Sequence, residues 1–308
     1  MRTALFCILI GNVLGGVSYA WMKRAADGLP PCTIAFGRAA IGAACLGIWL
    51  LARPGARVEW SREDRRTILL TGVVACAVPL ALGVVGTDLS TAANGSILIL
   101  LEPVAIVAFA RVLLGERMGR LRALGLAAGL AGGVIVALER REGAMSLFAG
   151  PHFVGNLALA LSAVLWGLYT PLLTPVARRH AALPVTFAVT AVSAVALVPA
   201  ALFESPRWEA GPALLPALGW TALMGVAISF LGTLLWTRAL RDLPSGVIAP
   251  FIFLQPVVGV LVGVLWLHES VSSAAAAGGA LVAAGVVLVI LGEGGSPRPR
   301  GAGAADAA

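Results

Sequence analysis

Long apolar segments are the feature that most limits what this chain can fold into. Its 308 residues are 59% hydrophobic and 12% charged, with a mean hydropathy of +0.94, and a soluble core cannot hide that much apolar surface. A helix of about 20 mostly apolar residues is long enough to cross a bilayer. The chain divides into ten such segments, at residues 3–22, 31–52, 67–86, 92–114, 121–138, 151–172, 181–203, 214–237, 244–267 and 271–291. The sequence therefore predicts an all-α integral membrane protein with ten transmembrane helices.

The lysines and arginines are distributed unevenly between the predicted connections. If the chain starts inside, the inward segments hold 15 of the 22 basic residues and the outward segments hold five. The other two, Arg38 and Arg111, lie within helices, and Arg111 is near enough to its helix end to reach the interface. Basic residues concentrate on the cytoplasmic side of membrane proteins. The net charge of +7 therefore indicates a topology with both termini in the cytoplasm, and not a nucleic-acid partner.

Part of the sequence recurs 153 residues later. Residues 101–138 align with residues 254–291 without a gap and match at 14 of 38 positions. A composition rich in Ala, Val, Leu and Gly inflates such a score, so the proline and glutamate matches carry the most weight. These matches are Pro103 with Pro256 and Glu116 with Glu269. They predict that the chain consists of two related halves.

Each half contains five of the predicted helices. The halves cover residues 1–143 and 150–292, and a disordered cytoplasmic tail follows at 293–308. Because five is an odd number, the second half enters the membrane from the opposite side to the first. Glu116 is then in a cytoplasmic connection and Glu269 in an external one. The predicted architecture is an inverted repeat, which allows a transporter to alternate between two related states around a binding site near the membrane midplane.

The fourth and ninth predicted helices carry polar residues beside a proline at mid-depth. A carboxylate at the centre of a spanning helix costs about 2.5–3.5 kcal/mol, so Glu102 should face the protein interior or a watery cavity. Pro103 removes a backbone donor, and we expect it to leave the Ile99 carbonyl without its usual partner and to kink the helix. Pro256 acts in the same way beside the neutral Gln255. Broken helices with polar side chains at the midplane are typical of transporter binding sites.

Two roles are open for Glu102. In the first, which is the working hypothesis, it binds substrate or carries a coupling proton, because ionisable groups inside the membrane are functional by default. In the second, it forms a structural ion pair with Arg38, which lies about 10 Å of helix inside its own segment. A functional and a structural role are equally open for Arg38.

Further polar and aromatic residues are candidates to line a cavity. Asn12 and Asn94 lie within predicted helices, and Trp166 lies near the centre of the sixth, with Tyr169 three residues later. The aromatic pair is placed to stack on a substrate. The alternative is that Trp166 and Tyr169 pack tightly and that Asn12 forms an interhelical hydrogen bond. The sequence leaves both alternatives open.

The sequence contains no motif for an enzyme or an ATP-driven pump. There is no GxSxG, HExxH or GxGD motif, and the single lysine, Lys23, follows no Walker A glycines. The cysteines lack CxxC spacing and predict neither a disulfide nor a metal site, at Cys7, Cys32, Cys45 and Cys76. No cofactor is expected. Stripes of glycine and alanine in the fifth and tenth helices favour close packing within the fold, and leave a monomer or a homodimer open.

Two stretches resemble a known family of membrane proteins. Residues 101–117, LEPVAIVAFARVLLGER, and residues 229–270 resemble the proline-bearing fourth and ninth helices of EamA-type exporters in the drug/metabolite transporter superfamily. The resemblance covers nearly the whole chain, and an arginine in the second helix, here Arg38, is a familiar feature of these exporters. In this family the fourth and ninth helices end in an L-G-E-like turn. The turn after the ninth helix departs from that pattern here, because His268 stands where a glycine is usual.

This resemblance implies a secondary active transporter in a bacterial inner (cytoplasmic) membrane. Its expected cargo is a small metabolite, such as an amino acid or a related compound, or a drug-like molecule. The implied partners are that small-molecule substrate, the lipid bilayer and, if Glu102 couples transport, protons. Uptake instead of export, and a channel or membrane scaffold, are the alternatives.

Overall fold

The fold of this chain is helical throughout the part that the structure describes. The computed structural model describes residues 2–53, 58–90, 98–139, 152–205, 211–258, 261 and 273–292. Within these ranges the chain forms helices joined by short turns, and no strand occurs among them. The all-α prediction is confirmed for these residues.

The helices follow one another in two sets. The first set is α1 (Arg2–Ala26), α2 (Pro31–Leu51), α3 (Arg62–Gly72), α4 (Val78–Asp88), α6 (Leu101–Leu113) and α7 (Arg120–Glu139). The second set is α8 (Phe153–Arg179), α9 (Ala182–Glu204), α10 (Leu214–Met224), α11 (Thr233–Asp242), α12 (Ser245–Ile248) and α14 (Ser273–Leu291). Two π-helical segments make longer rods, because η1 (Val73–Ala77) joins α3 to α4 and η3 (Gly225–Gly232) joins α10 to α11. A 3-10 helix, η4 (Ala249–Phe253), follows α12.

Several of these helices are long and apolar enough to cross a membrane. In the described residues five qualify: α2, the Arg62–Asp88 rod, α8, α9 and the Leu214–Asp242 rod. Shorter apolar helices occur at Arg2–Ser18, Ser245–Val258 and Ala276–Leu291. Large apolar side chains face outward, among them Leu51 (87% exposed) and Phe203 (80% exposed). The protein therefore crosses the membrane several times, while the predicted spans 92–114 and 244–267 lie partly outside the described residues.

The fourth predicted helix differs from the expected continuous span. α6 begins at Leu101 after a turn at Ile99 and Leu100, so Pro103 lies in its first turn. Proline is tolerated there because the first N–H groups of a helix have no intrahelical acceptor. The N–H of Glu102 donates to the Ile99 carbonyl (3.0 Å). The Ile99 carbonyl thus lacks its usual partner, an N–H at position 103, as predicted, and the Glu102 N–H takes that place. The expected kink is instead a turn that precedes the helix.

The corresponding region of the second set is also interrupted. α12 gives way to the 3-10 helix η4, and residues 254–258 are again α-helical. The Leu254 N–H donates to the carbonyls of Phe251 and Ile252. Gln255 and Pro256 follow this change directly. Both matched prolines therefore stand just after a departure from regular α-helix.

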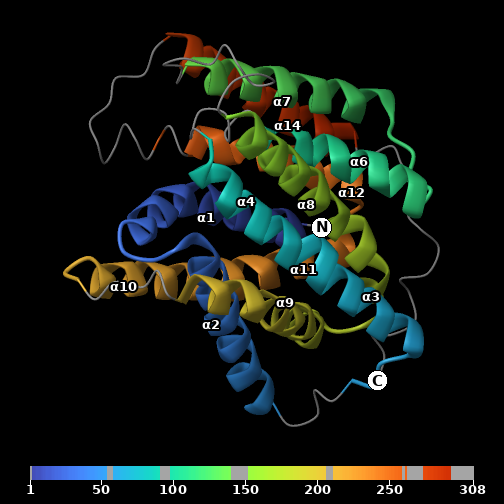
Figure 1. The fold of residues 1–308 in the computed structure, drawn as a ribbon. Coiled ribbons are helices and arrows are strands. Elements are labelled where there is room, and N and C mark those ends of the chain that lie inside the picture. Colours follow the sequence, from blue (N-terminus) through green and yellow to red (C-terminus); the bar gives the residue numbers. More distant parts are fainter. Residues whose placement is uncertain are drawn as a thin grey trace.

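The helices pack in pairs that cross from one set to the other. α7 lies along α14 (Figure 1), and α2 packs against α9 and η3. α8 packs against α4 and α6, and α1 packs against α10 and α11. The core between the two sets is therefore shared by both.

Glycines allow α7 and α14 to approach closely. A Cβ on Gly125 would lie 2.6 Å from the Gly285 carbonyl oxygen, and one on Gly132 would lie 2.5 Å from the Gly278 carbonyl oxygen. Neither distance leaves room for a side chain. Because Gly125 matches Gly278 and Gly132 matches Gly285 in the repeat, the two contacts cross. The glycine-rich face of α7 is thus used within the fold.

Candidate functional site

Arg38 links the two sets of helices. Its Nε donates to Ser229 Oγ (3.3 Å), which joins α2 to the π-helical segment η3. Gly42, one turn further along α2, permits this approach, because a Cβ there would lie 2.5 Å from the Ser229 Cβ. π-helical turns are frequent at functional sites, since they displace side chains from the regular helical register. The structure therefore places a guanidinium and a hydroxyl together inside the bundle.

Glu102 is half-buried in the first turn of α6. It forms no ion pair with Arg38, or with any other residue, within the described part of the chain. α6 packs tightly on α8 nearby, because a Cβ on Gly167 would lie 3.0 Å from the Ile106 nitrogen. The structural ion pair between Glu102 and Arg38 is therefore not found among these residues, and the carboxylate is available to a proton or a polar group of a ligand.

Asn12 and Gln255 are brought together. The Gln255 Nε2 donates to Asn12 Oδ1 (3.0 Å), and the Asn12 Nδ2 donates to the Ile8 carbonyl of its own helix (2.8 Å). Asn12 is fully buried. Gly15 makes room for the Gln255 side chain, since a Cβ there would lie 3.1 Å from Gln255 Nε2. The bond between helices, which was one of the two alternatives for Asn12, is what the structure contains.

Trp166 and Tyr169 form part of an aromatic layer on α8. Their ring centroids are 6.1 Å apart and the rings are tilted. Tyr169 is buried, whereas Trp166 is half-buried. Trp166 packs against two apolar clusters of the core, one that contains Leu173 and one that contains Leu80. Next to them, the Trp236 Nε1 of α11 donates to Thr170 Oγ1 (3.1 Å). This layer joins α8 to α11, and Trp236 was not among the predicted residues.

The matched glutamate of the first half also bridges the two sets. Ser245 Oγ donates to Glu116 Oε1 (3.5 Å) at the first residue of α12. Burial raises the pKa of the Glu116 carboxyl, and the nearby Arg178 charge and the hydrogen bonds from Ser245 and Gly246 oppose that rise. Glu116 therefore fixes the corner after α6 to the start of α12. The remaining predicted residues lie outside the described ones, at Asn94 and Glu269.

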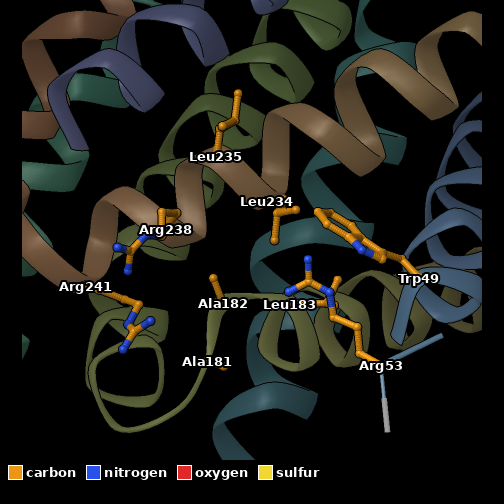
Figure 2. Close-up of a pocket in the computed structure, with 9 residues that line it drawn as sticks. All are labelled: Trp49, Arg53, Ala181, Ala182, Leu183, Leu234, Leu235, Arg238 and Arg241. Carbon is orange, nitrogen blue, oxygen red and sulfur yellow. The ribbon is translucent and has the colours of Figure 1, made fainter. Parts of the chain in front are cut away.

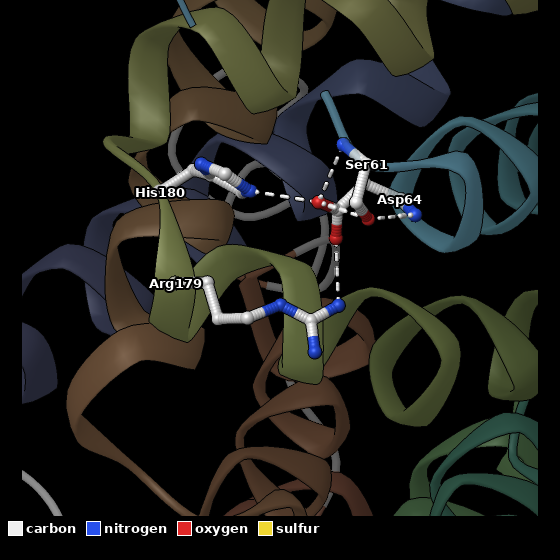
Figure 3. A network of polar contacts seen from close by, with 4 residues as sticks. All are labelled: Ser61, Asp64, Arg179 and His180. Carbon is white, nitrogen blue, oxygen red and sulfur yellow. Dashed lines mark hydrogen bonds and ion pairs between the residues drawn. The ribbon is translucent and has the colours of Figure 1, made fainter. Parts of the chain in front are cut away.

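A polar cluster on the same side of the bundle was not predicted (Figure 3). Asp64 is almost fully buried, and its Oδ1 accepts from Arg179 Nη2 (2.6 Å), while its Oδ2 lies 3.1 Å from His180 Nε2. Ser61 and Asp64 also form a capping box at the start of α3, with Ser61 Oγ accepting from the Asp64 N–H (3.0 Å). We name Ser61, Asp64, Arg179 and His180 the Asp64 cluster. It ties the start of α3 to the end of α8.

The opposite end of the bundle has its own ties. Glu204, buried at the end of α9, accepts from the Thr33 N–H (2.9 Å) and from Thr33 Oγ1 (3.3 Å) at the start of α2. Ser90 Oγ donates to Asn156 Oδ1 between the ends of α4 and α8. The two sets of helices are therefore connected by polar contacts at both ends, and by the Arg38 and Asn12 contacts between them.

A pocket opens where α2, α9 and α11 meet (Figure 2). Its volume is about 410 Å³, and it is lined by Trp49, Arg53, Ala181, Ala182, Leu183, Leu234, Leu235, Arg238 and Arg241. The Arg53 guanidinium lies over the Trp49 ring, 4.9 Å from its centroid. From the sequence, these arginines were interpreted only as indicators of membrane topology. The spacing of Leu234, Arg238 and Arg241 by four and three residues, which puts them on one helical face, was the available signal.

Metal chemistry has no ready site in the described chain. Among those residues no three His, Cys, Asp or Glu side chains are close enough together to hold a metal ion. The four cysteines are free thiols. The predicted residues that lie inside the bundle instead carry amides, a guanidinium and a carboxylate, which recognise polar ligands by hydrogen bonds and charge.

Comparison with known proteins gives consistent results. The model of the EamA-like transporter family matches residues 2–138 and 153–291. A protein of Streptantibioticus cattleyicolor, named "Probable terminal-alkyne amino-acid exporter", is 31% identical over 295 residues, which are 94% of each chain. The pseudopaline exporter CntI of Pseudomonas aeruginosa is 26% identical over 284 residues, covering 92% of this chain and 94% of that one.

Two further similarities concern a shorter stretch and the fold. The aromatic amino acid exporter YddG of Ancylobacter novellus is 28% identical over 211 residues, covering 66% of this chain and 68% of that one. A solved crystal structure matches with a TM-score of 0.78 at 24% identity, covering 94% of this chain and 97% of the other. This last similarity concerns the fold alone. Because the family model matches most of the chain, the protein belongs to the EamA-like transporter family and is a membrane transporter, not an enzyme.

Proposed function

We propose that the protein exports a small amino-acid-like metabolite across the bacterial inner membrane by alternating access between two inverted halves, residues 1–143 and 150–292. The observation that carries this proposal is the pair of interrupted helices, which stand just before Pro103 and Pro256 at matched positions of the repeat. Interrupted helices expose backbone polar groups in mid-membrane, where a transporter binds its cargo.

The packing of the helices supports the inverted repeat. In a two-fold arrangement, a contact between residue i and residue j is repeated between their counterparts. Gly125 meets Gly285, and their counterparts Gly278 and Gly132 also meet. The π-helical segments support the same relation, because η1 and η3 begin within one residue of matched positions. The family model also matches two separate stretches of similar length.

The substrate class follows from the relatives and the polar groups together. Three relatives are named as exporters, of a terminal-alkyne amino acid, of aromatic amino acids and of pseudopaline. An amino-acid-like cargo carries a carboxylate and an ammonium group. Arg38 is suited to the carboxylate, and Glu102 is suited to the ammonium or to a coupling proton. Trp166 offers an apolar surface for the side chain of such a cargo.

The distribution of basic residues supports the proposed orientation of the chain in the membrane. The Asp64 cluster and the bond from Ser245 to Glu116 lie among the arginine-rich connections, which the positive-inside rule assigns to the cytoplasm. Both termini are then cytoplasmic. Rocking of one half against the other would have to break these contacts in order to admit cargo from that side.

The test compares metabolites outside cells that produce the unaltered protein, Glu102→Gln or Glu63→Gln at matched membrane abundance. Glu63 is an exposed glutamate in the first turn of α3 and serves as the charge-matched control. We expect one compound to accumulate outside with the unaltered protein and with Glu63→Gln, and at least about tenfold less with Glu102→Gln. Equal export by both variants would show that export does not require the Glu102 carboxylate, and Arg38 would be the next residue to test.

The same cells discriminate between the alternatives. Depletion of a compound from the medium would indicate uptake, and flux that never saturates would indicate a channel. If neither is seen and nothing accumulates outside, the transport proposal fails. Proton coupling is tested separately by the pH dependence of export, and an unchanged pH dependence in Glu102→Gln would exclude that carboxyl as the proton carrier.

A further inference from the structure

The pocket between α2, α9 and α11 combines three arginines with an apolar wall. Trp49 and Arg53 come from the end of α2 and lie on one side of it, and Arg238 and Arg241 come from α11 and lie on the other (Figure 2). The remaining wall is made of leucine and alanine side chains from the start of α9 and from α11. A cavity of this composition suits a ligand with a multiply charged anionic head and an apolar remainder.

The guanidinium groups of the pocket lack carboxylate partners. Within the part of the chain that the structure describes, no ion pair is formed by Arg53, Arg238 or Arg241. Arg238 and Arg241 are half-buried, and Arg53 is exposed but lies against the Trp49 ring. Stacking on the ring restrains the Arg53 side chain, which lowers the entropy lost when it binds an anion. The pocket therefore presents positive charge in a restrained geometry, with no ion pair to a carboxylate among the described residues.

The repeat shows that the fold itself does not require these arginines. The counterparts of Trp49 and Arg53, 153 residues later, are Leu202 and Pro206. The counterparts of Arg238 and Arg241, 153 residues earlier, are Val85 and Asp88. The matched positions of the sequence are thus apolar or acidic. The positive-inside rule explains basic residues at this end, but it does not explain why three of them share one concave site with a tryptophan.

The pocket also adjoins the surface that faces lipid. Ile48 and Leu51, on either side of Trp49, are 69% and 87% exposed at the end of a membrane-spanning helix. An acyl chain lying on this surface brings its headgroup to the level of Arg53. Basic pockets between helix ends on the cytoplasmic side attract anionic lipid headgroups.

We propose that this pocket binds the phosphate of an anionic phospholipid from the cytoplasmic leaflet, with Arg53, Arg238 and Arg241 around the phosphate and Trp49 and Leu234 against the glycerol and the first acyl carbons. The inference is independent of the cargo and of the direction of transport. α2 belongs to the first half, and α9 and α11 belong to the second. A lipid bound in the pocket therefore bridges the halves at their cytoplasmic ends.

The test measures lipid binding to the purified full-length protein in detergent by native mass spectrometry. The probes are phosphatidylglycerol and phosphatidylcholine with identical acyl chains, and glycerol 3-phosphate as a soluble phosphate ester. The variant is Arg238→Gln with Arg241→Gln. The control is Arg65→Gln with Arg66→Gln, which removes two exposed arginines at the same end of the molecule. Equal thermal midpoints in phosphatidylcholine establish that the variants are folded, and Arg53→Gln replaces the double variant if its midpoint falls.

We expect the unaltered protein and the control to bind phosphatidylglycerol at least about tenfold more tightly than the double variant, because each arginine near an anionic headgroup contributes a factor of about five. Phosphatidylcholine binding should not change. If glycerol 3-phosphate at equal concentration displaces phosphatidylglycerol, the pocket is a phosphate site for a soluble ester, and the lipid proposal is wrong. An equal loss of phosphatidylglycerol binding in variant and control would overturn the proposal, since the effect would then be general surface charge.

Discussion

At the scale of single residues, Asp64 is the most heavily connected carboxylate in the described chain. It accepts from Arg179, contacts His180, and completes the capping box of α3 with Ser61. His180 is held in turn against the Trp60 ring, with centroids 4.9 Å apart. A nearly buried carboxylate with this many donors is stabilising as long as all of its partners are present. Its removal should therefore affect the connection between α3 and α8 as well as the helix cap.

Asp64→Asn tests this connection. The amide keeps the shape of the side chain, but it loses the charge that pairs with Arg179 and one of the acceptors used by the cap. Because the Arg179 side chain is 46% exposed, we expect a moderate loss of about 1–3 kcal/mol in the free energy of unfolding. Thermal unfolding in detergent measures it, with Glu63→Gln as the control on the same turn. Matching midpoints for the two variants would show that the Asp64 cluster contributes nothing to stability.

At the scale of helices and their corners, the end of α6 depends on one backbone conformation. Gly115 has φ +65°, which is the left-handed region where a side chain is strained. The N–H of Glu116 then donates back to the Ala110 carbonyl (3.2 Å), which closes the end of the helix. This corner positions Glu116 for its bond with Ser245. In the second half the matching position is His268, which lies outside the described residues.

Gly115→Ala and Gly119→Ala form a matched pair that isolates this effect. A Cβ at either position would meet nothing within 4 Å, so packing is equal, and only Gly115 has a positive φ. We expect Gly115→Ala to lower the free energy of unfolding by about 1 kcal/mol and Gly119→Ala to leave it nearly unchanged. Chemical or thermal unfolding in one detergent is sufficient to compare them. A larger loss for Gly119→Ala would contradict the backbone explanation.

Helix identity was easier to predict from the sequence than the contacts of individual side chains. Apolar length marked the spans, and the proline matches marked the interrupted region, because both signals are local. The loss of the usual partner of the Ile99 carbonyl was predicted correctly, but the kink was not found, since a proline in the sequence does not say whether a helix bends there or begins anew. The Asp64 cluster and the pocket were missed because their members come from helices that only the fold brings together. The capping box of Ser61 and Asp64 can be predicted from the local sequence, but the contact with Arg179 cannot, because Arg179 is distant in the sequence.

At the scale of the whole molecule, the orientation in the membrane is the property on which the proposed function depends most. Gly119 and Gly211 are exposed, and a side chain at either position would meet nothing within 4 Å. In the proposed topology Gly119 lies in a cytoplasmic corner and Gly211 in an external one. The two positions therefore report the orientation without disturbing packing.

Single cysteines at these positions provide the measurement, in a background where the four native cysteines are replaced by alanine or serine. A maleimide that cannot cross membranes should label Gly211→Cys in intact cells. It should label Gly119→Cys only after the cells are permeabilised. The opposite pattern would invert the assigned topology, and it would place the lipid pocket and the Asp64 cluster on the external side.

The crossed glycine contacts between α7 and α14 bear on how the chain is made. α7 is synthesised well before α14, and its glycine face fits the glycine face of that later helix. During synthesis α7 is therefore without its partner while α8 to α12 are made. The glycine face of α7 therefore lacks this partner in every intermediate of synthesis that has not yet reached α14.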